Sequence, residues 1–191
     1  MLSDPDVGTL YFRDAGPRFA IRSGLESDWW AKSREVTAPS LLASEMLAAH
    51  NIVRSDFGVP PLVWSDRLAA IAQEWANTLL ARHQLGHRPR LSFGENLFEI
   101  KGPGVDASPS LVVETWAAES PHYEYGLGKC RDTVRGQSED GTRLLTGCEN
   151  WTQLVWRATK EVGCAVARGE TREVWVCNYD PRGNWVGVRP Y

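Results

Sequence analysis

Four cysteines constrain the fold of this chain more than any other feature. Cys130, Cys148, Cys164 and Cys177 all lie in the C-terminal third of a 191-residue sequence. They form no CxxC pair, which argues against a zinc knuckle or a thioredoxin-type motif. An even number without metal-ligand spacing favours two disulfides and an oxidising compartment, with four buried thiols in a cytosolic protein as the alternative.

The last two cysteines fall in a predicted β-hairpin. Residues 162–167 and 174–179 are strand-like in composition and alternation, and the short connection between them contains a glycine. A turn centred between residues 170 and 171 places Cys164 directly opposite Cys177. Facing residues of antiparallel strands lie about 4.5 to 5.5 Å apart at Cα, a separation that a disulfide tolerates.

The first two cysteines belong to residues 126–148, a segment rich in glycine and charge that is predicted to be a long loop. The geometry thus suggests the pairs Cys164–Cys177 and Cys130–Cys148. The second pair would clamp the loop and restrict its freedom in the unfolded chain.

Hydrophobic periodicity predicts helices ahead of the hairpin. The expected helices cover residues 40–57, 65–85, 108–120 and 149–159. Ser40 and Ser65 are the expected N-caps of the first two, because a serine side chain can accept a bond from the open helix end. His50 lies one turn after Met46, near the buried edge of the first helix. Residues 88–104 are expected to be an irregular connection with a short apolar piece.

The order of elements, with helices first and a hairpin last, predicts an α+β sandwich of helices on a small antiparallel sheet. Residues 40–191 are expected to form this domain, and residues 1–39 an N-terminal extension. The extension lacks the basic, apolar and small-residue layout of a secretory signal, so either a leader is removed or none exists. No stretch of about 18 apolar residues is present, which argues against a transmembrane segment.

Charge is the next constraint on function. The formal net charge is −3, from 24 acidic and 21 basic residues, without a long run of either sign. The chain as a whole therefore lacks the basic footprint that nucleic acid or an anionic membrane would require.

The histidines and two glutamates are the candidate site residues. His83 and His87 are interpreted as a helix C-terminal cap, since Gly86 and Pro89 interrupt the helix, and His122 as a solvated loop residue. His50 is directed inward.

Glu95 stands in the turn-like stretch "FGENL", and Glu119 shares a predicted helix face with Trp116. One histidine and two glutamates in an aromatic-walled cleft could bind a divalent cation or act as general acid and base. The alternative is a buried hydrogen-bonded network that holds the helices in register. No GxSxG, P-loop or HExxH motif occurs.

Several motifs in register carry a family resemblance over about residues 40–191. They are "HNIVR", "PLVWSDRLAAIAQEWA", "GENL", the tryptophan, glutamate and tyrosine of "WAAESPHY", "WTQLVWRAT" and the C-terminal "CNYDPRGNWVGVRPY". Together they resemble the CAP superfamily, also called SCP/TAPS, which includes cysteine-rich secretory proteins, venom antigen 5 and plant pathogenesis-related group 1 proteins. The resemblance implies secretion, a three-layer α-β-α sandwich and a central cleft lined by two histidines and two glutamates.

Carried over by position, the resemblance assigns the cleft to His50, Glu95 and Glu119. The second family histidine falls on Asn150, and Gln153 follows in the same motif as a further cleft candidate. A carboxamide is a poorer zinc ligand than imidazole, so a zinc site is disfavoured and at most a weak magnesium or calcium site is expected. No cofactor is required on this reading.

Three functions follow from the resemblance. The first is a secreted, non-enzymatic binding module for a sterol, fatty acid or other small apolar ligand, in defence or host interaction, acting as a monomer or weak dimer. The second is a metal-assisted hydrolase or protease that uses His50, Glu95 and Glu119. The third is release of a C-terminal peptide, since residues 181–191 fit the form PxGNxxxxxPY.

Overall fold

The computed structural model describes residues 40–131, 136–137, 143–144 and 147–191. Its centre is a four-stranded sheet in the order β1-β7-β8-β2. The strands are β1 (Val63–Trp64), β2 (Gly94–Lys101), β7 (Glu161–Arg168) and β8 (Arg172–Asp180). The predicted hairpin is present as β7 and β8. Residues 1–39 lie outside the described part of the chain, and the domain boundary at residue 40 stays a prediction.

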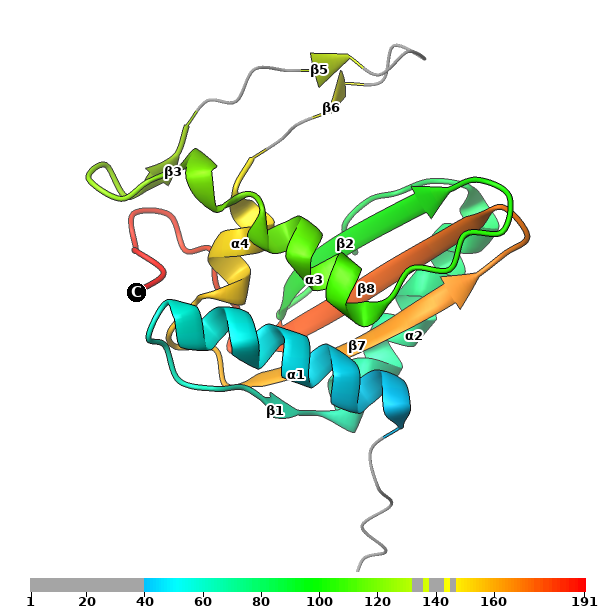
Figure 1. Cartoon of the computed structure of the whole chain (residues 1–191), viewed down its shortest axis with the longest axis horizontal. Coiled ribbons are helices and arrows are strands. Elements are labelled where there is room, and N and C mark those ends of the chain that lie inside the picture. The colour runs from blue at the N-terminus through cyan, green and yellow to red at the C-terminus, as the bar shows by residue number, and fades with distance from the viewer. Residues whose placement is uncertain (1–39, 132–135, 138–142, 145–146) are drawn as a thin grey trace, which may run out of the picture. The chain divides into compact units, whose positions relative to one another are not determined.

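Helices cover both faces of this sheet, which confirms the predicted sandwich (Figure 1). The helices are α1 (Leu41–Asp56), α2 (Asp66–Arg82), α3 (Pro109–Ala117) and α4 (Glu149–Leu154). Helix α2 packs on one face against small side chains such as Ala165 and Val176. Helices α1, α3 and α4 lie on the other face, where Trp116, Trp151 and Trp175 form the larger core. These three tryptophans are each 2% exposed or less, and their burial contributes strongly to the free energy of folding.

Two expectations about the sheet are wrong. The sheet is mixed, because β1 pairs with β7 in parallel, from Val63 opposite Glu161. Residues 94–101 form the edge strand β2, which pairs with β8 from Gly94 opposite Tyr179 to Lys101 opposite Arg172, where an irregular connection was expected. An edge strand is only partly covered on each face, so its sequence "GENLFEIK" shows no clear two-residue period.

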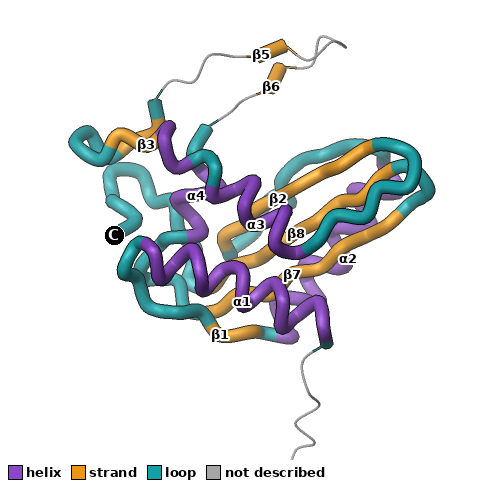
Figure 2. The backbone as a smooth tube through the Cα atoms, viewed as in Figure 1, coloured by secondary structure: helices purple, strands orange, loops and turns teal. Residues whose placement is uncertain are grey.

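Helices α1 and α3 begin and end within three residues of their predicted bounds, whereas α4 ends at Leu154, five residues before the predicted end (Figure 2). The side chain of Ser65 makes no capping bond to α2. The side chain of Ser40 accepts a bond from Ala43 N at 3.2 Å, as an N-cap should. Helix α2 ends at Arg82, before the predicted Gly86, because His83 adopts the left-handed conformation with φ 53° and terminates it. The interpretation of His83 as a helix cap is therefore confirmed.

Two disulfides join the same cysteine pairs that the hairpin and loop geometry suggested. Cys164 and Cys177 are register partners on β7 and β8, with Cα atoms 4.1 Å apart. Cys130 and Cys148 have Cα atoms 5.5 Å apart and close the segment between β4 (Lys129–Cys130) and α4. This segment also contains the short pair β5 (Gly136–Gln137) and β6 (Arg143–Leu144), and its other residues lie largely outside the described chain.

The connection between α3 and β4 contains the 3-10 helix η2 (Ser120–His122) and the strand β3 (Tyr123–Glu124), which pairs with β4. His122 on η2 is exposed, as the sequence predicted. None of the helices in the described ranges is both long and apolar enough to span a membrane.

The C-terminal segment packs along the helical layer. Pro190 O accepts a hydrogen bond from Arg157 N at 2.7 Å, and the ring of Tyr191 lies 5.7 Å from that of Phe57. Trp185, by contrast, is 54% exposed, so of the two C-terminal aromatics only Tyr191 covers the core. Release of this segment as a peptide stays a prediction.

Arg54 on α1 is fully buried, and its hydrogen-bond partners among the described residues are all backbone carbonyls. Its Nε donates to Pro60 O at 2.7 Å, and its Nη1 donates to Leu154 O at 2.7 Å and Trp156 O at 3.1 Å. Its Nη2 donates to Thr159 O at 3.3 Å. Burial lowers the pKa of the guanidinium to about 10, which leaves it charged at neutral pH. One side chain thus satisfies carbonyls of the α1–β1 and α4–β7 connections.

We expect Arg54→Met to lower the free energy of unfolding by at least about 3 kcal/mol, because several carbonyls lose their buried donor at once. Urea denaturation followed by circular dichroism measures this loss. Arg157→Met is the matched control, since Arg157 is exposed and its side chain makes one long bond to Gly58 O at 3.5 Å. A similar change for both variants would show that the buried contacts of Arg54 contribute little.

Candidate functional site

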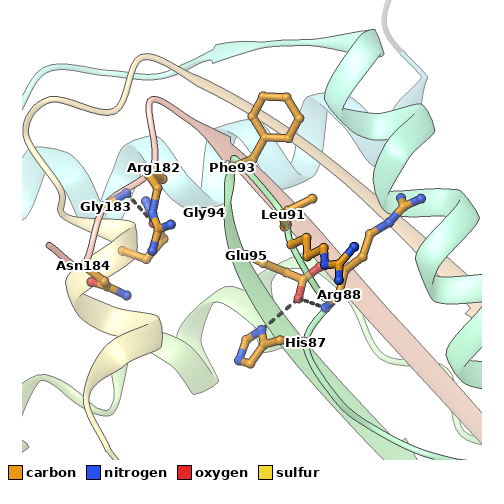
Figure 3. Close-up of a pocket in the computed structure, with 11 residues that line it drawn as sticks. His87, Arg88, Leu91, Phe93, Gly94, Glu95, Arg182, Gly183 and Asn184 are labelled. Atoms are coloured by element: carbon orange, nitrogen blue, oxygen red, sulfur yellow. Dashed lines mark hydrogen bonds and ion pairs between the residues drawn. The ribbon is translucent and has the colours of Figure 1, made fainter.

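Glu95 and His87 form the central polar pair of the candidate site (Figure 3). The Nδ1 of His87 lies 2.8 Å from Oε1 of Glu95, and Arg88 N donates to the same oxygen at 3.0 Å. The side chain of Glu95 is 4% exposed, whereas that of His87 is 70% exposed. Oε2 of Glu95 is buried without a hydrogen-bond partner among the residues that the structure describes. The hydrogen bond that Nδ1 of His87 donates to the Glu95 carboxylate raises the pKa of His87.

A pocket of about 420 Å³ opens beside this pair. His87 and Glu95 lie on one side of it, and Arg182, Gly183 and Asn184 of the C-terminal segment lie on the other (Figure 3). Gln153 also lines it, and its Oε1 accepts a bond from Gly183 N at 2.9 Å. Gln153 is thus the predicted cleft residue that joins α4 to the pocket wall.

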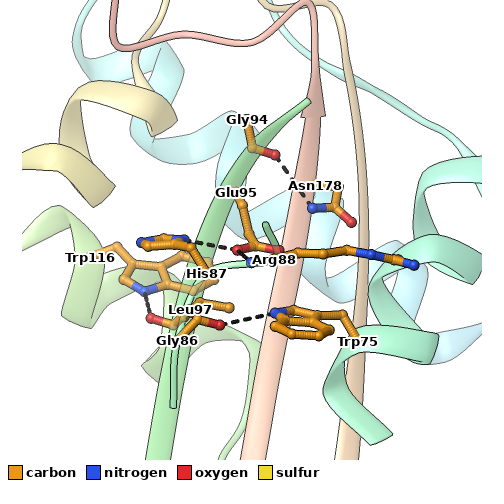
Figure 4. A network of polar contacts seen from close by, with 9 residues as sticks. All are labelled: Trp75, Gly86, His87, Arg88, Gly94, Glu95, Leu97, Trp116 and Asn178. Carbon is orange, nitrogen blue, oxygen red and sulfur yellow. Dashed lines mark hydrogen bonds and ion pairs between the residues drawn. The ribbon is translucent and has the colours of Figure 1, made fainter. Parts of the chain in front are cut away.

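Side-chain contacts with α2 hold the loop around His87 in place (Figure 4). Trp75 on α2 donates from its indole to Gly86 O at 3.0 Å, immediately before His87. The guanidinium of Arg88 binds Glu74 at 3.1 Å and lies over the ring of Trp75. The loop after α2 is therefore tied to that helix on both sides of His87.

Glu119 has a different set of partners. Its Oε1 accepts from Asn150 Nδ2 at 2.7 Å, and its Oε2 accepts from Asn150 N at 3.0 Å and Trp151 N at 3.1 Å. The carboxylate therefore caps the open N–H groups at the start of α4. Burial raises the pKa of Glu119, while these three hydrogen bonds act in the opposite direction.

His50 is not part of an accessible cleft, which corrects its predicted placement. It is 0% exposed; its Nδ1 lies 2.7 Å from Met46 O and its Nε2 2.9 Å from the hydroxyl of Tyr179. Nδ1 must donate to the carbonyl, so Nε2 accepts from the tyrosine. Burial lowers the pKa of His50 to about 4. The helical periodicity correctly predicted that His50 points inward. It lies in the closed core, however, and lines no accessible cleft.

His87 is the residue that the sequence reasoning misassigned, since a cap role was expected for it. The helix has already ended at His83, so His87 is free to reach β2. Its sequence signal was its position eight residues before Glu95 of "GENL". The contact between His87 and Glu95 depends on the position of β2, which the sequence did not predict.

The residues at this site do not fit a zinc ion. His87 offers one imidazole and Glu95 one unpartnered oxygen, whereas zinc sites use three or four protein ligands. Both carboxylate oxygens of Glu119 are occupied, and Asn150 supplies an amide donor to them. His50 lies near Cys164 and Cys177, but those sulfurs form a disulfide and offer no thiolate.

The three-layer sandwich, its two disulfides and its C-terminal pocket define the class of this domain. The chain matches the model of the CAP, or cysteine-rich secretory protein, family over residues 47–179. It therefore belongs to the CAP family, and the resemblance in its sequence motifs is confirmed.

Plant proteins are among its relatives. The chain is 38% identical over 148 residues to pathogenesis-related leaf protein 6 of Solanum lycopersicum, covering 77% of this chain and 82% of that protein. It is 39% identical over 148 residues to pathogenesis-related protein 1A of Nicotiana tabacum, covering 77% and 79% respectively.

Solved structures of the same fold come from more distant proteins. Schistosoma mansoni venom allergen-like protein 4 matches with a TM-score of 0.59 at 23% identity, covering 80% of this chain and 95% of that one. The crystal structure of NaASP2 with Zn2+ matches with a TM-score of 0.62 at 20% identity, covering 83% and 88%. At these identities the likeness concerns the fold.

We expect the pKa of His87 to lie above its ordinary value of 6.5 and to fall in Glu95→Gln. A raised pKa means that the pair stabilises the fold at pH below 6.5 and that this contribution fades as pH rises through the folded-state pKa. The stabilisation is small because His87 is largely exposed. NMR titration of the imidazole Hε1 measures the value; identical titration curves in both proteins would contradict the assigned contact.

The ionisation of His50 should change the free energy of unfolding with pH in the opposite direction to that of His87. Its pKa is lowered from 6.5 to about 4, so its contribution to stability is complete above pH 6.5 and is lost as pH falls toward 4. The expected loss over this range is about 3 kcal/mol. Urea unfolding at a series of pH values should show this slope in the natural protein and a much smaller one in His50→Gln. An unchanged slope in the variant would assign the effect to other groups.

Proposed function

We propose that this CAP-family protein is an extracellular, non-enzymatic binding module for a fatty acid or sterol. The observation that carries the proposal is a second pocket, of about 410 Å³, formed by the end of α2 and the loop after it. Trp75, Leu79, Leu85 and Pro89 give it an apolar wall, and Arg82 supplies a guanidinium. We call it the 75–89 pocket. Small-molecule sites are commonly of this size, with apolar walls and a few polar groups.

The charge of Arg82 favours a fatty acid over an uncharged ligand. Arg82 makes no ion pair within the described part of the chain, so its guanidinium is available to a carboxylate. The acyl chain would lie against Trp75 and Leu85. Leu85 is 46% exposed, which is a position that gains burial when an apolar ligand binds.

The polar groups of the candidate site support binding better than hydrolysis. Glu119 is committed to the start of α4, and His87 is committed to Glu95. No hydroxyl or thiol of the described residues hydrogen-bonds to His87, and all four cysteines are in disulfides. Nucleophilic catalysis requires such a nucleophile and base in contact. The alternative of a metal-assisted hydrolase therefore has less support, and the donor set does not favour a metal.

An extracellular location is part of the proposal. Two disulfides form most readily in an oxidising compartment. The relatives are pathogenesis-related proteins of plants, which is consistent with a role in defence.

We expect labelled palmitate to bind the purified protein, and Leu85→Asp to weaken binding about tenfold, since it places a second charge beside the acyl chain. Leu111→Asp is the matched control, because Leu111 is 44% exposed on α3 and should leave binding unchanged. Arg82→Ala should weaken palmitate binding without affecting labelled cholesterol. Absence of saturable binding of both ligands, or an equal loss in both aspartate variants, would overturn the proposal.

A further inference from the structure

Exposed apolar side chains gather on two short segments next to the C-terminus. Ten large apolar side chains are exposed in the described chain, and half of them lie in residues 125–127 and 185–188. They are Tyr125 (47% exposed), Leu127 (65%), Trp185 (54%), Val186 (101%) and Val188 (54%). Scattered exposed residues are normal, but such a concentration marks an interaction surface.

The two segments form one surface, because hydrogen bonds join them. Arg189 Nη2 donates to Gly126 O at 3.2 Å, and the hydroxyl of Tyr125 donates to Tyr191 O at 3.2 Å. The rings of Tyr125 and Tyr191 lie 5.4 Å apart. Figure 1 shows the turn after β3 and the C-terminal segment side by side at one end of the helical layer. We call residues 125–129 and 182–189 the C-terminal surface.

Hydrogen bonds within the C-terminal segment and to α4 fix the backbone that carries these exposed side chains. Val188 N donates to Trp185 O at 3.0 Å, which closes a turn with Val186 at its tip. Asn184, just before the turn, accepts from Thr152 at 2.7 Å and donates to Glu149 O at 2.9 Å. The turn is therefore anchored to α4, and the side chain of Val186 has no protein surface to cover.

Basic side chains accompany the apolar ones. The guanidinium of Arg182 lies 4.8 Å from the ring centre of Trp185, and that of Arg189 lies 5.1 Å from that of Tyr125. Residues 181–191 contain two arginines and no acidic side chain, and residues 125–129 contain Lys129 and no acidic side chain. The C-terminal surface is therefore locally positive in a chain whose net charge is −3.

This combination fits the boundary of an anionic lipid bilayer. Tryptophan and tyrosine rings favour the zone between headgroups and acyl chains, where one end of the ring is apolar and the other wet. Arginine can keep its guanidinium at the phosphates while its stem lies along apolar surface. Each basic side chain near an anionic membrane contributes attraction that salt weakens.

We propose that the C-terminal surface docks reversibly onto an anionic lipid bilayer, with Trp185, Val186 and Leu127 entering the interfacial zone. Arg182 and Arg189 then contact lipid phosphates. This inference goes beyond the proposed function, which concerns a single ligand molecule in the 75–89 pocket. The absence of a basic run in the sequence argued against an anionic membrane, because the basic residues meet the apolar ones only across the fold.

Cosedimentation with vesicles tests the proposal. The protein should bind vesicles of phosphatidylcholine with phosphatidylglycerol, and bind vesicles of phosphatidylcholine alone far more weakly. Leu127→Asp and Val186→Asp should each lower binding about tenfold, because a carboxylate is driven into an anionic interface. Ile52→Asp is the matched control: Ile52 is 65% exposed, as Leu127 is, but lies on α1, outside the C-terminal surface.

The arginines provide a second readout. Arg182→Gln and Arg189→Gln should each weaken vesicle binding about fivefold at low salt, and the double variant should show a smaller salt dependence. Melting curves of all variants check that folding is intact. Equal binding to both kinds of vesicle, or equal losses in Leu127→Asp and Ile52→Asp, would overturn the proposal.

Self-association would also overturn it. If size-exclusion chromatography shows a dimer that Val186→Asp abolishes, and vesicles are not bound, the surface is an interface between two copies. The two proposals fail independently, because Leu85→Asp should leave vesicle binding unchanged and Leu127→Asp should leave palmitate binding unchanged.

Discussion

The hydrogen bonds from the buried guanidinium of Arg54 hold together the connections at one end of the domain. The connections that flank the sheet are irregular, so their carbonyls have no strand or helix partner and need a donor from a side chain. Arg54 provides that donor to Pro60, Leu154, Trp156 and Thr159. It thereby fixes the exit from α4, from which Gln153 and Thr159 reach the C-terminal segment. Arg54 therefore helps to position Gln153 in the wall of the pocket beside Glu95, although Arg54 does not line that pocket.

The two glutamates of the site show how partners decide the role of a side chain. Glu119 accepts three bonds at the start of α4 and acts as a helix cap, a role in which Asn150 contributes both its backbone and its amide. Glu95 accepts its bonds through one oxygen and keeps the other unpartnered and buried. Of these two carboxylates, only that of Glu95 keeps a buried oxygen without a partner among the described residues.

Local patterns predicted most of the helices and the hairpin because each depends on neighbouring residues. Ser40 caps its helix, and Cys164 faces Cys177, as their spacing required. The edge strand β2 was missed because it is only partly covered on each face, which blurs the alternation of its side chains. Because Glu95 lies on that strand, its contact with His87 could not be predicted without the position of β2.

The family, most of the helices, the disulfide pairs and the inward direction of His50 could all be predicted from the amino-acid sequence. These features rest on periodicity, spacing and motifs that lie within short stretches of chain. Three features required the folded structure: His87 faces Glu95, His50 is enclosed in the core, and residues 125–127 adjoin the C-terminal segment. Such pairings join segments far apart in the chain, and the packing of helices on the sheet sets their distance, for which no local pattern carries a signal.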